Sequence, residues 1–234
     1  MMTESETKIT GGGKERTQQA AELLSVAFST DPVITYLLNM LPASKQLSYR
    51  RSLFDTLLTA GGLNGATFNE ADGWQSCAVL MHPGQRVDNP FTLVQSGLFS
   101  VLWNLGVKGC VRMLFEYTSL TDAAKYKALH NRKRFYYVFF VGTLHEYRGK
   151  GLSSALIRDI QAQAARDQLP VWLEATTSYS HQLYQKLGFD TVGEIVLGKG
   201  KAAPDGTEAE GGDGVKIWGM IWWPQKESTA ESNN

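Results

Sequence analysis

A glycine-rich hexapeptide, Arg148-Gly149-Lys150-Gly151-Leu152-Ser153, is the segment whose residue types and spacing best predict chemistry. It lies between an apolar, strand-like segment and a segment with helical periodicity. A glycine-rich turn that opens a helix exposes backbone N–H groups at the positive end of the helix dipole, and this combination binds phosphate. Arg148 and Lys150 add positive charge. The alternative is a strand-to-helix turn whose basic residues are incidental.

The hexapeptide differs from two common phosphate-binding motifs. A Walker A loop needs Ser or Thr after its Gly-Lys pair, whereas Gly151 follows Lys150 here. A dinucleotide fingerprint needs a further glycine in the region that Ser153 and Ser154 occupy. The turn therefore matches neither class.

The segments around the turn predict an α/β fold. The stretch 135–143 is apolar on both faces and rich in aromatic and β-branched residues, which is typical of a central, covered strand. From that strand onwards, the predicted elements are strand 135–143, helix 152–166, strand 170–175, helix 180–187 closed by Gly188, and strands 191–197 and 216–223. A succession of strand, helix, strand and helix is typical of an α/β fold.

The first half of the chain is predicted to be mainly helical. Periodicity predicts helices over 17–28, 48–60, 92–105 and 108–130, and one strand over 75–81. Gly61-Gly62 is expected to stop the second helix, and Asp31-Pro32 to break or restart the chain after the first.

The polar segments predict the domain organisation. Residues 1–14 and 225–234 lack core residues and are expected to be flexible tails. Residues 198–214 are dense in glycine and are expected to form a mobile loop. We therefore expect a single domain over residues 15–224.

Composition excludes several classes of protein. The 23 Lys and Arg residues balance the 23 Asp and Glu residues, which argues against a dedicated nucleic-acid binder. Cys77 and Cys110 are too few for a disulfide framework, so a reduced, cytoplasmic compartment is expected. The four histidines and two cysteines show no metal-ligand spacing, so no metal is expected. The apolar stretch 91–107 is short for a bilayer span, and no membrane partner is expected.

Two motifs together carry a resemblance to a known family. The run Val141-Gly142-Thr143-Leu144-His145-Glu146-Tyr147-Arg148-Gly149-Lys150-Gly151 resembles the acyl-CoA-binding motif [R/Q]-x-x-G-x-[G/A] of the GNAT N-acetyltransferases. Arg148 and Gly151 match this motif, whereas Ser153 replaces the final Gly or Ala and His145 replaces a frequent proline. About 30 residues later, Leu173-Glu174-Ala175-Thr176 and Leu183-Tyr184-Gln185-Lys186-Leu187-Gly188-Phe189 are similar to a second GNAT signature. The second motif also resembles the corresponding motif in the GNAT branch that contains antibiotic-modifying acetyltransferases.

The resemblance implies a mixed central β-sheet flanked by helices, with acetyl-CoA in a cleft between strands 135–143 and 170–175. The pantetheine arm would pair with the backbone of Val141, Gly142 and Thr143. The pyrophosphate would bind the amides of the residues of the turn, which are Arg148, Gly149, Lys150, Gly151, Leu152, Ser153 and Ser154.

Tyr184 matches the tyrosine that protonates the departing CoA thiolate. A tyrosine with a pKa of ~10 keeps its proton at neutral pH and donates it to a thiolate whose conjugate acid has a pKa of ~8.5. The alternative for Tyr184 is a packed helix aromatic.

A general base is harder to identify, because 135–143 contains no acid. Glu174 is the best candidate, since a carboxyl in an apolar strand tends to have a raised pKa. The alternative for Glu174 is a structural acid bonded to backbone. Asp31 and Glu116 are further candidates, and Tyr136 or Tyr137 would position the acceptor. Six aromatic residues predict either an acceptor pocket or core: Phe28, Tyr36, Phe91, Phe99, Trp103 and Phe115.

The resulting hypothesis is an acetyl-CoA-dependent N-acetyltransferase that acts on a primary amine of a small molecule. Two alternatives remain open: a non-catalytic CoA-binding or sensory module, and an enzyme that acetylates protein amines through the loop 198–214. A homodimer is also compatible with the sequence.

Overall fold

The computed structural model describes residues 7–87, 89–97, 103, 106, 112, 116–130 and 132–225. Its strands are β1 (Ile9–Gly12), β2 (Thr67–Ala71), β3 (Ser76–Met81), β4 (Tyr136–Thr143), β5 (Val171–Ala175), β6 (Asp190–Leu197) and β7 (Val215–Trp222). Its helices are α1 (Thr17–Ala27), α2 (Pro32–Leu38), α3 (Ala43–Leu63), α4 (Pro90–Gln95), α6 (Thr118–Ala128), α7 (Leu152–Arg166) and α8 (Ser178–Lys186), with 3-10 turns η1 (Lys14–Arg16) and η3 (His145–Tyr147).

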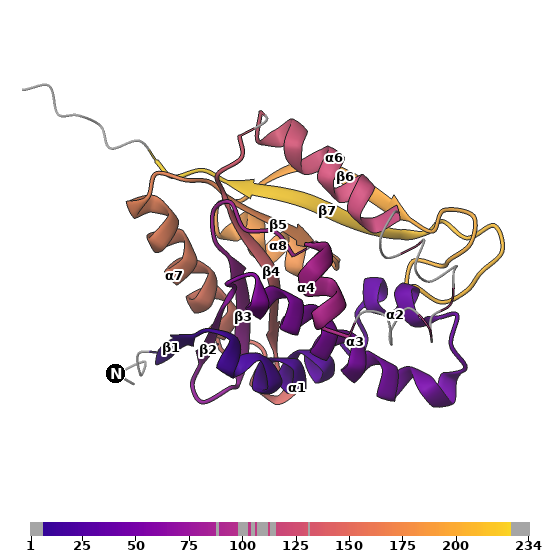
Figure 1. The fold of residues 1–234 in the computed structure, drawn as a ribbon. Coiled ribbons are helices and arrows are strands. Elements are labelled where there is room, and N and C mark those ends of the chain that lie inside the picture. The colour runs from indigo at the N-terminus through magenta and orange to yellow at the C-terminus, as the bar shows by residue number, and fades with distance from the viewer. Residues whose placement is uncertain are drawn as a thin grey trace, which may run out of the picture.

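The strands form one mixed sheet in the order β1-β2-β3-β4-β5-β7-β6. The β4–β5 pair is parallel and the other neighbouring pairs are antiparallel. Helix α7 connects the two parallel strands and lies away from α1 and α3, as Figure 1 shows. The predicted mixed sheet flanked by helices is confirmed.

Alternation of side chains along the strands separates two layers of core. Leu173 of β5 packs with the α7 residues Leu156 and Ile160, whereas its neighbour Trp172 packs with Leu129 beyond α6. On the α1 side, Leu24 and Phe54 pack in a separate cluster with strand residues. Successive side chains of a strand point to opposite faces, so β5 contributes to both layers.

Strands β4 and β5 pair over only two positions. Tyr136 pairs with Val171 and Tyr137 with Trp172, after which the paired register ends. On the other edge of β4, the register with β3 shifts between Val79 and Leu80, so that Phe139 has no partner. An extra residue of this kind bends a strand and increases its twist. The residues of β4 beyond the bulge therefore pair with β3 while their opposite edge faces away from β5.

Two predictions for the first half of the chain are wrong. Ile9–Gly12, expected in a tail, forms β1 because it pairs in register with β2. Helix α3 begins five residues before the predicted Ser48 and continues through Gly61-Gly62 to Leu63, because Ala60 and Gly61 are packed inside the fold. Burial of the helix offsets the low helix propensity of glycine.

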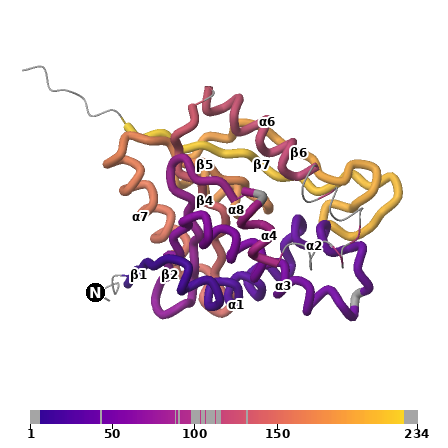
Figure 2. Tube along the Cα trace, in the orientation of Figure 1, coloured from indigo at the N-terminus to yellow at the C-terminus, as the bar shows by residue number. Residues whose placement is uncertain are grey.

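The segment 198–214, expected to be a mobile loop, has a defined internal hydrogen-bond pattern. The Gly200 N–H donates to the Gly212 carbonyl over 2.8 Å, and Ala202 is fully buried. The Asn39 side chain, just after α2, donates to the Gly206 carbonyl over 2.9 Å. Figure 2 shows this segment between β6 and β7 beside α2. The segment thus has defined backbone contacts although it contains few apolar side chains.

The elements predicted for the second half of the chain agree with the structure to within two residues at each end. Helix 152–166 matches α7, and Gly188 follows the end of α8 with φ of 83°. The expected helix 92–105 is described at 92–97 and 103, and α4 ends there at Gln95 before a turn. The expected helix 108–130 is described at 112 and 116–130, and α6 begins there at Thr118. Cys110 and the segment 226–234 lie outside the described residues. Within the described ranges no individual helix is long and apolar enough for a bilayer span, although the bent pair Lys14–Ala27 and Pro32–Leu38 meets that criterion jointly by length and composition.

We predict that Gly142→Ala lowers the free energy of unfolding by about 1–3 kcal/mol, because overpacking a filled site strains its neighbours. A β-carbon at Gly142 would lie 2.9 Å from Leu24 Cδ2 and 3.0 Å from the Ala27 β-carbon, where α1 crosses β4. Urea unfolding measures the change. Gly193→Ala is the matched control, because nothing lies within 4 Å of a β-carbon there. Equal stability of the two variants would contradict the prediction.

Candidate active site

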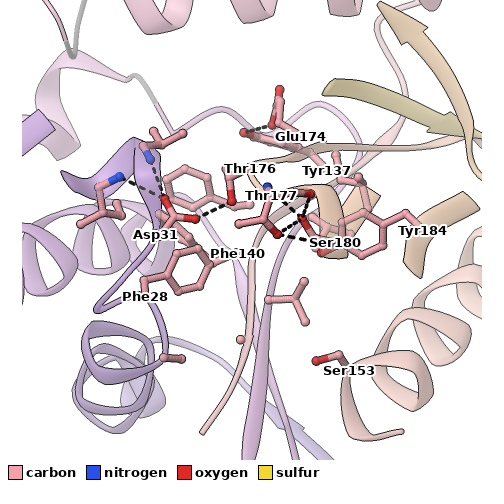
Figure 3. A pocket seen from close by; sticks show the side chains of 18 of the residues that line it. Phe28, Asp31, Tyr137, Phe140, Ser153, Glu174, Thr176, Thr177, Ser180 and Tyr184 are labelled. Carbon is pink, nitrogen blue, oxygen red and sulfur yellow. Dashed lines mark hydrogen bonds between the residues drawn. The ribbon is translucent and has the colours of Figure 1, made fainter. Parts of the chain in front are cut away.

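A cavity of about 700 Å³ opens where β4 and β5 part. Its wall runs from the glycine-rich turn before α7, past the ends of β4 and β5, to α2, α6 and α8. Figure 3 shows Ser153 at one end of the cavity and Glu174 at the other, with Asp31 and Tyr184 on opposite sides. The parting of the two strands thus brings the sequence-predicted residues into one space.

The turn before α7 has the backbone shape of an anion site. Gly149 and Gly151 both have φ of 79°, a left-handed conformation that side chains rarely adopt. Nothing lies within 4 Å of a β-carbon built on either glycine, so a ligand has room to approach the backbone. The first N–H groups of α7 have no intrahelical acceptor and are available there.

Nearly all of the predicted cofactor-binding residues line the cavity. Those on its wall are Val141, Gly142, Thr143, Arg148, Gly149, Gly151, Leu152, Ser153 and Ser154. Lys150 is not among the lining residues, and its ammonium lies 4.7 Å from the centre of the Tyr147 ring. The Arg148 guanidinium donates to the carbonyls of Ala27 and Thr143, so it joins the end of α1 to the end of β4.

Ser153, which replaces a Gly or Ala of the motif, is accommodated by hydroxyl partners. Its Oγ lies 2.6 Å from Thr143 Oγ1, which lies 2.8 Å from Ser76 Oγ. Ser76 in turn donates to the Gly142 carbonyl over 3.0 Å. This chain of hydroxyl groups fixes the start of α7 against the end of β4.

Tyr184 is buried on α8 and faces the cavity. Burial, and then the negative charge of Asp31, raises the pKa of its hydroxyl above the ordinary value. No hydrogen bond to another described residue engages this hydroxyl. A protonated, unengaged hydroxyl beside the cavity is suited to donate a proton.

Glu174 lies on β5, on the face toward α6. Its carboxylate accepts from Tyr137 Oη over 2.9 Å and from Trp172 Nε1 over 2.7 Å. Burial raises the pKa of Glu174, and the positive charge of Lys125 and these two donors oppose that rise. Both of these donors are side chains, one from Tyr137 on the cavity wall and one from Trp172 on β5, rather than backbone groups.

Asp31 is a second buried carboxylate on the wall. It caps α2, where its Oδ1 accepts from the N–H groups of Val33 and Ile34 over 2.9 and 3.0 Å. Its Oδ2 accepts from Thr176 Oγ1, at the end of β5, over 2.5 Å. Burial raises the pKa of Asp31, whereas these three donors lower it. The Thr176 contact joins the two sides of the cavity.

Two other predicted candidates lie outside the cavity. Glu116 accepts from Tyr36 Oη over 2.8 Å and from the Gly198 N–H over 2.7 Å, so it joins α2 to the β6–β7 loop and is not a base for this site. The Tyr136 hydroxyl donates to Asp167 on the α7 side of the sheet. Of the proposed pocket aromatics, Phe28 lines the cavity, whereas Phe91 and Trp103 are 80% and 89% exposed. Phe99 and Phe115 lie outside the described residues.

Sequence reasoning missed the residues that α6 and the preceding turn contribute. Tyr117 and Lys125 line the cavity near Glu174, and Lys125 forms an ion pair with Asp122. Burial, and then the charge of Glu174, raises the pKa of Tyr117 well above its ordinary value. Only helical periodicity marked this segment in the sequence, and periodicity does not tell which face meets a site. Within the described ranges no group of three or more His, Cys, Asp or Glu side chains is placed to hold a metal ion.

Comparisons with known proteins identify acetyltransferases as similar to this chain. Residues 72–189 match the family described as Acetyltransferase (GNAT) family. An uncharacterized N-acetyltransferase of Schizosaccharomyces pombe is 25% identical over 217 residues, which cover 92% of this chain and 83% of that protein.

Two solved structures share the fold. One is described as histone acetyltransferase HPA2 and related acetyltransferase from Corynebacterium glutamicum, with 20% identity, coverage of 96% and 99% of the two chains, and a TM-score of 0.62. The other is a Drosophila melanogaster polyamine N-acetyltransferase described as forming N-acetylagmatine, with 14% identity, coverage of 93% and 100%, and a TM-score of 0.60.

The raised pKa of Glu174 predicts how stability depends on pH. A group whose pKa is higher in the folded state stabilises fully below its unfolded pKa, and this contribution is lost as the pH rises through the folded pKa. The ordinary value is 4.5, so wild type loses this contribution above about pH 4.5, whereas Glu174→Gln has none to lose. We expect the difference in unfolding free energy, wild type minus variant, to fall as the pH rises.

Urea unfolding of wild type and each variant between about pH 3 and about pH 8 measures this difference, because the contribution of a raised pKa changes above the ordinary value and that of a lowered pKa changes below it. Glu194→Gln is the control of opposite sign, because hydrogen bonds from Lys216 and Trp218 lower the pKa of the exposed Glu194 carboxyl. For that pair the difference grows as the pH rises, and it is small because exposed pairs are screened. A difference that grows with pH for Glu174→Gln would contradict the raised pKa.

Proposed function

The chain belongs to the acetyltransferase (GNAT) family, and on that premise we propose that it transfers an acetyl group from acetyl-CoA directly to a primary amine of a small molecule. The observation that carries the proposal is that one continuous cavity is lined by the glycine-rich turn, by Tyr184 and by two buried carboxylates. The fly neighbour is described as a polyamine N-acetyltransferase that forms N-acetylagmatine, which supports this acceptor class.

The cofactor would bind along the first half of the cavity. The N–H groups at the start of α7 fit a pyrophosphate, because they converge at a helix N-terminus with open space at Gly149 and Gly151. The free edge of Val141, Gly142 and Thr143 offers backbone groups to the amides of a pantetheine arm. Acetyl-CoA supplies an activated acyl group with a thiol as leaving group.

The residues at the middle of the cavity would transfer protons during the reaction. The transfer forms a bond between the amine nitrogen and the acetyl carbon and breaks the bond between that carbon and sulfur. Tyr184 donates its proton to the departing thiolate, which its raised pKa permits because the hydroxyl stays protonated at neutral pH. After the attack, the nitrogen carries one proton more than the amide product does. Loss of this proton, relayed through solvent to the tyrosinate, forms the amide and restores the tyrosine.

A carboxylate would take the proton that the ammonium must lose before it attacks. We assign this role to Glu174, whose two donors hold it at the cavity wall while burial raises its pKa above the ordinary value. Asp31 is the competing candidate, because it lines the same cavity and its charge reaches Tyr184. The size of the cavity, about 700 Å³, favours a small acceptor beside the pantetheine arm over a folded protein.

We predict that wild type releases thiol from acetyl-CoA with at least one member of a panel of primary amines. Tyr184→Phe should lower kcat by about 10²- to 10⁴-fold, the usual contribution of general acid catalysis, with little change in KM for acetyl-CoA. Thiol release measures both. Tyr136→Phe is the matched control, because that hydroxyl donates to Asp167 outside the cavity, and its kcat should be unchanged.

Calorimetric titration with CoA separates the alternatives. Absence of CoA binding at millimolar concentration would overturn the proposed function. Tight CoA binding with no turnover for any amine would instead favour the non-catalytic module. Turnover only with peptides or proteins would favour an enzyme that acetylates protein amines.

The two carboxylates are distinguished by isosteric amides. Glu174→Gln should lower kcat/KM by about 10²- to 10⁴-fold at neutral pH and remove the component of the acid limb that follows ionisation of Glu174. Asp31→Asn should keep the α2 cap, because Asn and Asp are equivalent N-caps, and should reduce activity far less. The rate profile against pH, measured with one amine for all three proteins, gives both results. The reverse ranking would assign the base to Asp31.

A further inference from the structure

Lys125 holds a buried ammonium group at the far end of the cavity. It lies on α6, and its side chain is 11% exposed. Its Nζ is 2.6 Å from Asp122 Oδ1 and 5.0 Å from the centre of the Tyr137 ring. The ring of Tyr126 lies 5.8 Å away. A carboxylate beside aromatic faces is the setting that binds alkylammonium ions, and here the protein's own side chain occupies it.

The carboxylates of the wall are already matched by donors or by a cation. Among the described lining residues, the acidic ones are Asp31, Asp122 and Glu174. Asp31 accepts from two backbone N–H groups and Thr176, and Glu174 accepts from Trp172 and Tyr137. Asp122 is paired with Lys125, whose positive charge also acts on Glu174.

The basic side chains on the same wall equal the acidic ones in number. They are Arg86, Lys125 and Arg148, and Arg86 has interactions of its own. The described wall therefore has no excess negative charge for a second cation. The wall also contains an apolar part, formed by Ile34, Leu37, Leu57, Val87 and Leu93 from α2, α3, α4 and the turn before α4.

We propose that Lys125 occupies the subsite that a second ammonium of an acceptor would need, and so makes the protein selective for primary monoamines with an uncharged body over diamines. The proposal rests on the proposed function, because it concerns the acceptor of that transfer. A diamine would place its distal ammonium next to Lys125, where like charges repel in a partly buried site. The body of a monoamine meets no such repulsion and packs against apolar side chains.

A competing role for Lys125 is recognition of a carboxylate on the acceptor. The 2.6 Å contact with Asp122 opposes it, since a second carboxylate would compete for an ammonium that is already paired. The two roles predict opposite substrate preferences, so one set of substrates distinguishes them.

The experiment uses three acceptors with the same five-carbon chain: pentan-1-amine, pentane-1,5-diamine and 5-aminopentanoate. The readout is the ratio of kcat/KM values within each protein, which cancels general effects of a substitution on catalysis. Wild type should prefer pentan-1-amine to the diamine by roughly tenfold or more. Lys125→Met keeps the length of the side chain and removes its charge, so the ratio should shift toward the diamine by roughly tenfold or more.

Two further variants test the charge and the helix. Lys125→Arg keeps the positive charge and should keep the preference for the monoamine. Lys127→Met removes an exposed lysine from the same helix and should leave all three ratios unchanged. CoA affinity, measured by calorimetry, confirms that each variant is folded.

Asp122→Asn provides an independent measurement if Lys125→Met fails to fold. It leaves Lys125 charged but without its partner, so the ratio should shift toward 5-aminopentanoate. A wild-type preference for the diamine or for 5-aminopentanoate would overturn the proposal. So would unchanged ratios in folded Lys125→Met or, where that variant does not fold, in Asp122→Asn. Failure of the proposed function is distinct, because wild type would then acetylate no amine at all.

Discussion

The structure depends on the short pairing between strands β4 and β5, which ends after two residue pairs. Parallel strands β4 and β5 share only the pairs Tyr136–Val171 and Tyr137–Trp172. Beyond these pairs, the bulge at Phe139 keeps β4 in contact with β3 while its other edge is released. A sheet normally satisfies both edges of an interior strand. Here the unpaired edge faces a cavity, and that cavity is the place where side chains from both core layers meet.

The parting of the strands also determines how polar groups are buried. Asp31 and Glu174 both line the cavity that this parting opens. Isolated buried carboxylates are costly, and each of these is held by two or three donors, some from its own element and one from a neighbouring element. The donors restrain the geometry, and burial nevertheless raises the pKa of both groups. A cleft built this way holds carboxylates that are oriented by their donors and whose pKa values lie above the ordinary ones.

How much of this arrangement the sequence predicts depends on how local its cause is. The turn at Gly149 and Gly151, the helix after it and the strand that carries Glu174 were predictable, because glycine geometry and apolar periodicity act over a few neighbouring residues. The contact between Thr176 and Asp31 spans 145 positions and has no local signal. Strand β1 is similar, since Ile9–Gly12 is a strand only because β2 is beside it. The ion pair of Lys125 was hidden because periodicity identifies a helix but not its partner.

The balance of charge along the cavity bears on the proposed transfer itself. An amine binds a carboxylate most tightly as ammonium, but it attacks an acyl group only after losing a proton. A wall of unpaired carboxylates would stabilise the ammonium and so stabilise the ground state at the expense of the reaction. On this wall the donors to Asp31 and Glu174 and the ammonium of Lys125 already satisfy the acids. In the proposed reaction, such a cavity would bind the body of the acceptor through apolar contacts and leave the reacting nitrogen free to deprotonate.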